Sequence, residues 1–131
     1  GINMVQSINT KVDLVTNGNS HMGLTDYGKI MVGDNGFEFY DDRNVRNFIQ
    51  IPWTEVKYVV VSVMFGGRWI PRFSFQTKRN GMITFSAKDP KKVLRAVRQY
   101  IEPDRIVKSL TFFQVLGRIF KGKGKKDKYL K

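Results

Sequence analysis

Histidine is the residue type in this sequence best suited to proton or phosphate transfer, and the chain contains one, His21. Imidazole titrates near neutral pH, so His21 could accept a phosphate group from a phosphotransferase protein. The residue follows a turn-forming Asn-Gly-Asn segment at 17–19. We therefore favour the simpler interpretation, a polar residue on the flank of a strand.

Two adjacent carboxylates, Asp41 and Asp42, could be taken for a metal-binding pair. They follow the aromatic segment 36–40, where Asp commonly ends a strand and solvates the turn. We therefore favour a structural role for the two residues, ending the strand and solvating the turn, over a metal site.

The segment GRIFKGK at 117–123 matches most of a phosphate-binding loop. Such a loop needs a strand before it and Ser or Thr after its lysine. Here Gly124 follows the lysine and a helix is expected before it. The match is attributed to a tail rich in Gly and Lys.

Composition argues against several other kinds of site. The chain has no cysteine, which excludes disulfides, thiol nucleophiles and thiolate metal ligands, and suits a reducing cytoplasm. No segment approaches the about 20 apolar residues that cross a bilayer. We expect a non-enzymatic protein without a cofactor.

Charge is distributed unevenly over the 131 residues, which suffice for one domain with one core. Residues 1–66 carry a net charge of −2 and residues 67–131 one of +14, which together give +12. The surface that attracts anionic partners is therefore expected in the second half.

Short alternating segments predict a mainly β domain over residues 4–103. A hairpin is clearest at 29–40, where two arms are joined by Asp34-Asn35, residue types that tolerate the positive φ of a tight hairpin turn. Glu38, between Phe37 and Phe39, is expected to point outward. About seven antiparallel strands are predicted, and eight segments are candidates for them: 10–16, near 21–24, 29–33, 36–40, 47–51, 57–65, 72–77 and 82–86.

A helix is predicted to start at Asp89-Pro90, because Asp is a good N-cap and Pro suits the first helical position. Apolar Val93, Val97, Tyr100 and Ile101 share one face. Five basic residues lie opposite and should form a basic ridge in solvent: Lys88, Lys91, Lys92, Arg95 and Arg98.

A second helix is predicted over about 105–120, within a C-terminal docking segment at 104–120. It is apolar around most of its circumference, so its own domain, another subunit or a membrane component must cover it. A basic, flexible tail follows at 121–131. The expected docking residues are Phe112, Phe113, Leu116, Arg118, Ile119, Phe120, Lys121, Lys123, Lys125 and Lys126.

Several phrases of the sequence carry a resemblance. The segment IPWTEVKYV at 51–59, the strand ending at Phe85 and the helix from Asp89 resemble a bacterial pleckstrin-homology-like domain. That resemblance implies an open barrel or sandwich of two antiparallel sheets capped by a C-terminal helix. The phrases GLTDYGKIMVGDNGFEFYDD and FQVLGRIF resemble the ManO-like family, the domain of unknown function 956 of Firmicute mannose-type phosphotransferase operons.

This resemblance implies an accessory or regulatory role in mannose or glucose uptake, with the membrane part of the transporter as partner. No catalytic residues are established for the family, so none are transferred. The first hairpin loop, residues 15–21, has no Lys or Arg, which argues against specific inositol-phosphate recognition. We expect a cytoplasmic protein, peripheral at the inner face of the membrane.

Three alternatives to docking remain. The helix at 105–120 could complete the core, or it could pair with a second copy of the chain. The basic half could also bind nucleic acid as a regulator of the operon, although no helix-turn-helix arrangement is visible.

Overall fold

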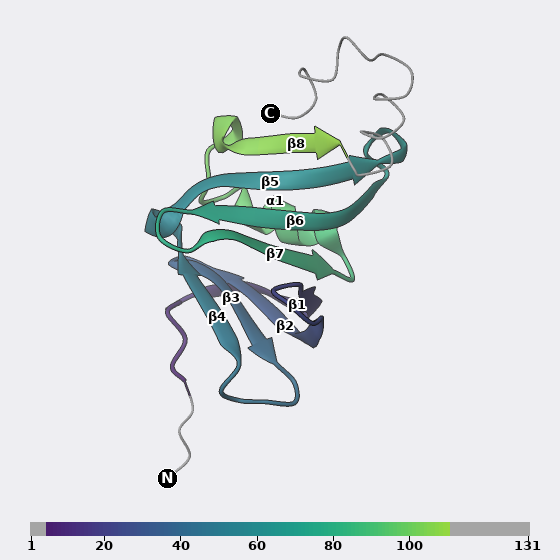
Figure 1. Ribbon diagram of the computed structural model, residues 1–131. Coiled ribbons are helices and arrows are strands. Elements are labelled where there is room, and N and C mark those ends of the chain that lie inside the picture. The colour runs from purple at the N-terminus through teal and green to yellow at the C-terminus, as the bar shows by residue number, and fades with distance from the viewer. Residues whose placement is uncertain (1–4, 111–131) are drawn as a thin grey trace.

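The structure, a computed structural model, describes residues 5–110 (Figure 1). The described chain is mainly β, with one α-helix, α1 (Pro90–Val97). The strands are β1 (Val12–Ser20), β2 (Asp26–Gly33), β3 (Gly36–Asp41), β4 (Phe48–Pro52), β5 (Val56–Met64), β6 (Trp69–Thr77), β7 (Gly81–Ala87) and β8 (Ile106–Leu110).

The strands form a single sheet in the order β4-β3-β2-β1-β7-β6-β5-β8. Figure 1 shows two arms of this sheet, β1–β4 and β5–β8, inclined steeply to each other. They join where β1 pairs with β7 over three residue pairs, from Gly18↔Ala87 to Ser20↔Phe85. The predicted antiparallel pairing holds throughout except between β5 and β8, which are parallel.

The first predicted turn is wrong, because β1 continues through residues 17–19 and no strand forms at 21–24. Gly18 lies where β1 pairs with both β2 and β7. A Cβ atom there would stand 2.2 Å from Ile30 Cδ1 and 2.8 Å from the Ser86 carbonyl oxygen. The glycine therefore permits close packing in a strand rather than a turn.

Replacing Gly18 by Ala is expected to lower the free energy of unfolding by about 1.5 kcal/mol, because the added methyl group overpacks the β1–β7 junction. Chemical denaturation of the two proteins measures the change. Gly23→Ala is a poor control because Gly23 has a φ of 110°. The control is Ser109→Ala, at a partly buried position of strand β8. It shows how far a small substitution within a strand lowers the free energy of unfolding in general.

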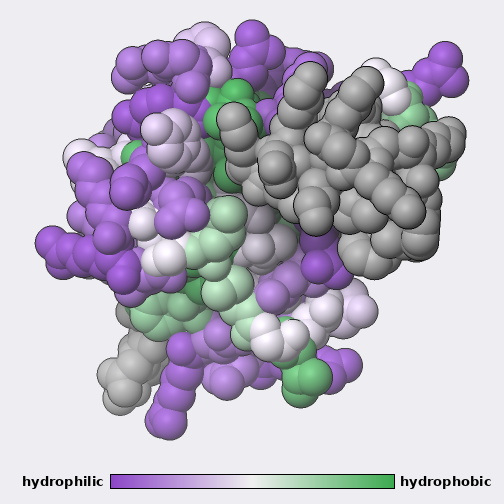
Figure 2. All heavy atoms as spheres, turned by 45° about the horizontal axis from the view of Figure 1, so that its top comes forward, coloured by the Kyte–Doolittle hydropathy of each residue, from purple (hydrophilic) through white to green (hydrophobic). Residues whose placement is uncertain are grey.

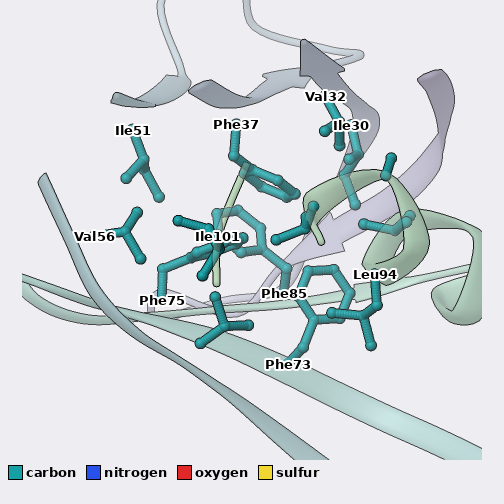
Figure 3. Packing of buried hydrophobic residues seen from close by; sticks show 14 of the residues in the cluster. Ile30, Val32, Phe37, Ile51, Val56, Phe73, Phe75, Phe85, Leu94 and Ile101 are labelled. Atoms are coloured by element: carbon teal, nitrogen blue, oxygen red, sulfur yellow. The ribbon is translucent and has the colours of Figure 1, made fainter. Parts of the chain in front are cut away.

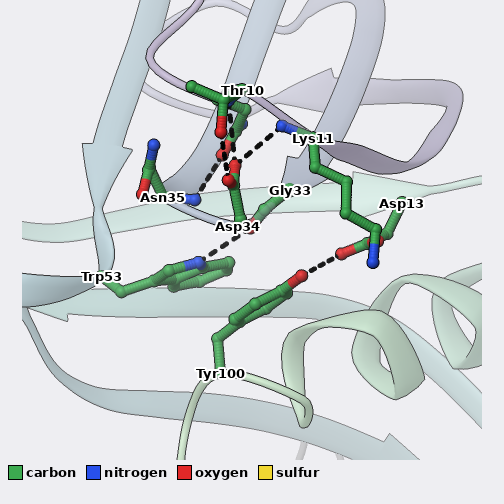
Figure 4. A network of polar contacts seen from close by, with 9 residues as sticks. Thr10, Lys11, Asp13, Gly33, Asp34, Asn35, Trp53 and Tyr100 are labelled. Carbon is green, nitrogen blue, oxygen red and sulfur yellow. Dashed lines mark hydrogen bonds and ion pairs between the residues drawn. The ribbon is translucent and has the colours of Figure 1, made fainter.

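The β2–β3 hairpin is confirmed, with Val32 opposite Phe37. The reason for its turn differs from the prediction, since neither Asp34 nor Asn35 has a positive φ. The N-terminal segment holds the turn instead (Figure 4). The Asp34 carboxylate accepts the backbone N–H groups of Thr10 and Lys11 at 2.9 and 3.0 Å.

The core lies between the two arms and is closed by α1 (Figure 3). Phe37 is central, with ring centroids 4.5 Å from Phe75 and 4.7 Å from Phe85. Val93 and Val97 of α1 are fully buried against this cluster. Burial of these large apolar side chains ties α1 to both arms.

Glu38 lies on the outward face of β3, as strand alternation predicts, and is nevertheless covered by another segment. It does face away from Phe37 and Phe39, but it is fully buried because residues 7–9 cover that face of β3. Its carboxylate accepts hydrogen bonds from Ser7 Oγ at 2.6 Å, Asn9 Nδ2 at 2.7 Å, Ile8 N at 3.2 Å, Gln50 Nε2 at 3.2 Å and the Tyr40 hydroxyl.

The predicted second helix is wrong over its first residues. Pro103–Arg105 forms a 3-10 turn and Ile106–Leu110 forms strand β8. The β-branched Ile106 and Val107 pair in parallel with Val59 and Val60, which covers the edge of β5. The remainder of the prediction, 111–120, lies outside the described residues.

Candidate functional site

The candidate site is the solvent side of α1, and the residues around Asp89 fix where that helix starts. Asp89 is the N-cap and its side chain accepts the Lys92 N–H at 3.4 Å. Pro90 occupies the first helical position. The predicted start is thus confirmed, while the regular helix ends at Val97 and leaves Tyr100 and Ile101 in the following turn.

The segment after α1 is anchored to the sheet by aromatic packing. The Tyr100 ring stacks on Trp53 with centroids 5.6 Å apart, and its hydroxyl donates to Asp13 (Figure 4). Trp53 Nε1 donates to the Gly33 carbonyl oxygen at 2.9 Å. Together with the burial of Ile101, these contacts hold the end of the helix to β1, β2 and the turn at Trp53.

One side of α1 is basic and exposed, as predicted. Val93, Leu94, Ala96 and Val97 face the core. The opposite side carries the α1 basic ridge, in which every member is exposed: Lys88, Lys91, Lys92, Arg95 and Arg98. Since 3.6 residues make one turn, Lys91, Lys92, Arg95 and Arg98 project over one sector of the helix surface, and Lys88 lies just before the helix.

The ridge has no acidic partner among residues 5–110. The ion pairs of that part of the chain are Lys11–Asp13, Lys29–Asp42 and Arg79–Glu55. Lys91 and Lys92 also lie in the first turn, near the positive end of the helix dipole, where a cation is unfavourable by about 0.3–1 kcal/mol. An anionic partner would relieve this repulsion, so the ridge is suited to an anionic surface.

The predicted docking residues from Phe112 to Lys126 all lie outside the described residues.

Strand β8 ends at Leu110, on the edge of the sheet beside β5 (Figure 1). In Figure 2, most of the visible coloured surface is hydrophilic, with a hydrophobic band between the purple regions. Val107 of β8 belongs to the exposed hydrophobic residues, with 43% of its surface accessible.

His21 is half-buried, and each of its ring nitrogens lies near a hydroxyl group. Nε2 is 2.7 Å from Ser86 Oγ and Nδ1 is 3.3 Å from Thr25 Oγ1. Burial, and secondly the charge of Arg72, hold the pKa of His21 below its ordinary value of 6.5. The structure therefore favours a neutral imidazole that links β1 to β7.

This pKa shift predicts a pH dependence of stability. An unfolded chain protonates His21 at a higher pH than the folded chain, so the free energy of unfolding should fall as the pH drops below 6.5. Denaturation between pH 7.5 and 5.5 measures the slope, which should be smaller in His21→Gln. An equal slope in both proteins would show that other groups cause it.

The adjacent carboxylates act in the β3–β4 loop. Asp41 accepts the Arg43 N–H at 2.7 Å and the Asn47 side-chain amide at 2.7 Å, which lowers the pKa of Asp41. Asp42 pairs with Lys29. Residues 5–110 contain no group of three His, Cys, Asp or Glu side chains suited to a metal ion.

A family model for the domain of unknown function 956 (DUF956) matches residues 4–120. The chain belongs to this family. No curated protein matches its sequence.

Solved structures share the fold of this DUF956 protein at low sequence identity. The crystal structure of the C-terminal domain of an unknown protein from Leishmania infantum matches with a TM-score of 0.58 and 11% identity, covering 69% of this chain and 83% of that one. The structure of the Spt16D Pob3N heterodimer matches with a TM-score of 0.57 and 8% identity, covering 77% and 55%. These matches establish similarity of fold.

No helix among residues 5–110 of the DUF956 protein has the length and apolar character needed to cross a membrane.

Sequence reasoning missed a set of polar residues that line a hollow beside Lys88: Asn17, Asn19, Tyr27 and Lys29. The signal that could have found them is the alternation of polar residues with Gly18 and Gly28. The Asn-Gly-Asn composition of residues 17–19 hides that signal, because it predicts a turn.

Proposed function

We propose that this DUF956 protein is a non-enzymatic accessory or regulatory protein of a mannose- or glucose-type phosphotransferase transporter. It docks on the membrane-embedded transporter or on the adjacent membrane surface. The observation that carries the proposal is the α1 basic ridge, five exposed cations without an acidic partner in the described chain. The transporter is suggested by the family resemblance of the sequence.

We also infer that the fold is pleckstrin-homology-like. Two inclined arms of one sheet, with an amphipathic helix closing the core between them, support this inference. In lipid-binding domains of this fold the first hairpin loop is basic, whereas the first hairpin loop of this chain is not. The exposed cations of α1 would therefore supply the electrostatic attraction to the membrane.

The energetics of docking follow from the number of cations. Each basic residue near an anionic leaflet contributes about 1 kcal/mol, and salt reduces that contribution. A stable attachment requires a second, apolar signal. We assign that signal to the C-terminal residues Phe112, Phe113, Leu116, Ile119 and Phe120, with the lysines after them adding to the electrostatic term.

The test is membrane co-fractionation of the full chain and of a chain ending at Leu110, which keeps strand β8, in cells with and without the transporter genes. A high-salt wash follows. Membrane association that survives the wash, and that needs both the transporter and residues 111–131, supports docking on the transporter. If both chains stay soluble in every strain and bind an operator DNA fragment in preference to random DNA, the nucleic-acid alternative replaces the proposal.

A further inference from the structure

A hollow of ≈ 550 Å³ lies beside the N-terminal end of α1, on the opposite face of the β1–β2 ladder from Ile30. Its size falls within the range of about 300–1,000 Å³ typical of small-molecule sites. The lining residues are Asn17, Gly18, Asn19, Tyr27, Gly28, Lys29, Asp42, Ala87 and Lys88.

The strand registers explain why these residues meet. Asn17 lies opposite Lys29, and Asn19 lies opposite Tyr27, with the Gly18–Gly28 pair between them. On the other side of β1, the backbone N–H of Lys88 donates to the Asn17 carbonyl oxygen at 3.2 Å. Lys29 of β2 and Lys88, which directly follows β7, therefore flank Asn17 from its two sides.

Charge in the hollow favours an anion. Two lysines stand against one carboxylate, and that carboxylate, Asp42, is already paired with Lys29 at 3.2 Å. Lys88 makes no ion pair within residues 5–110. Asn17 and Asn19 add amide groups, and Asn19 Nδ2 has a second N–H group besides the one donated to Ser86 Oγ at 3.0 Å.

We propose that this hollow binds a phosphate monoester, held between the ammonium groups of Lys29 and Lys88 with Asn17 and Asn19 as neutral hydrogen-bond partners. A monoester carries a charge of about −1.5 to −2 at pH 7, which two lysines can neutralise. Binding shifts Lys29 from Asp42 toward the ligand. The monoester has two sources, a free metabolite or a lipid headgroup. The site shares Lys88 with the α1 basic ridge, whereas Lys29 is not part of that ridge, so the Lys29 substitution tests the site separately from docking.

The test is NMR titration of the full chain with glycerol 3-phosphate, and with glycerol as the unphosphorylated control. Amide shifts should concentrate at residues 17–19, 27–29 and 87–88. Lys29→Gln and Lys88→Gln should each weaken binding at least fivefold. Lys57→Gln, which removes the same charge from an exposed position of β5, should change it less than twofold.

Asp42→Asn gives a prediction of opposite sign, since it removes the competing carboxylate and should tighten binding. The proposal is overturned if Lys57→Gln weakens binding as much as Lys88→Gln, because affinity would then follow net charge alone. It is equally overturned if glycerol shifts the same amides as strongly as glycerol 3-phosphate.

Vesicles distinguish the two sources. Phosphatidic acid presents a monoester and phosphatidylglycerol a diester. A lipid source predicts that Lys29→Gln lowers binding to phosphatidic acid vesicles and leaves binding to phosphatidylglycerol vesicles unchanged. A free source predicts tight binding of soluble glycerol 3-phosphate and no preference for phosphatidic acid. If neither soluble monoester nor phosphatidic acid binding depends on Lys29 and Lys88, the site is refuted.

Discussion

Glu38→Gln should lower the free energy of unfolding by roughly 3 kcal/mol. The native carboxylate is fully buried and accepts five hydrogen bonds, which come from three chain segments. An amide presents an N–H group to donors such as Ser7 Oγ and Asn9 Nδ2, so at least one buried donor loses its partner. Hydrogen bonds to a charged group contribute about 1.5–3 kcal/mol each, and unsatisfied buried donors add to the loss.

The pH dependence of this site has a defined sign. Burial alone would raise the pKa of Glu38, but the hydrogen bonds from Ser7, Tyr40, Asn9 and the Ile8 N–H outweigh it and hold the pKa below the ordinary value of 4.5. Stability from Glu38 is thus present at neutral pH and is lost as the pH falls below 4.5 toward the folded pKa. In Glu38→Gln that part of the acid transition should disappear.

Urea denaturation at pH 7 measures the cost of the substitution. The matched control is Glu55→Gln, because Glu55 pairs with Arg79 at 3.7 Å near the surface, where an ion pair contributes about 0–1 kcal/mol. A cost for Glu38→Gln no larger than for Glu55→Gln would contradict the role assigned to the covered carboxylate.

Neutralising the α1 basic ridge is the second change with a large expected effect. Replacing Lys91, Lys92 and Arg95 by Gln should weaken binding of the full chain to anionic vesicles roughly 100-fold. The value follows from about 1 kcal/mol per basic residue and about 1.4 kcal/mol per tenfold change in affinity. The fold should persist, because all three side chains are exposed and the buried face of α1 is unchanged.

Vesicle sedimentation at low and physiological salt measures this effect. A control with the same loss of charge replaces Arg43, Lys57 and Lys78, which are exposed positions away from α1. That control should lose less than tenfold. Equal losses in the two variants would mean that net charge, rather than the ridge, determines attachment.

The sequence was most informative where local rules are sufficient. The Asp89-Pro90 signal and the 3.6-residue period located α1 and its exposed cations, because helix geometry alone determines which residues share a face. The β2–β3 hairpin was located from local signals as well, namely two arms joined by a turn-forming Asp-Asn pair. Its turn is held by Thr10 and Lys11, which lie outside the hairpin.

Predictions failed where distant segments decide the structure. Residues 17–19 have the composition of a turn, yet Gly18 serves close packing among three strands. Ile106 and Val107 fit a helical pattern, but in the structure they pair in parallel with β5 along its edge. Strand alternation placed Glu38 on the correct face and could not reveal that the irregular residues 7–9 cover it.

The two parts of the candidate site also differ in whether the sequence alone could predict them. The α1 basic ridge was predicted residue by residue, and its role in docking stays a prediction. The hollow beside Lys88 could not be predicted, because it requires the register that places Asn17 opposite Lys29 and next to Lys88. A site made by strand pairing becomes visible only when the pairing is known.

Docking through α1 is the central claim, and the absence of cysteine from the chain allows a direct test with single labels. An environment-sensitive fluorophore is attached at Gln99→Cys, on the exposed side of the segment after α1, or at Met82→Cys, on the outer face of β7. With membranes from cells that contain the transporter, the label at position 99 should respond and the label at 82 should not. A response at 82 without one at 99, at equal bound fraction, would contradict docking through α1.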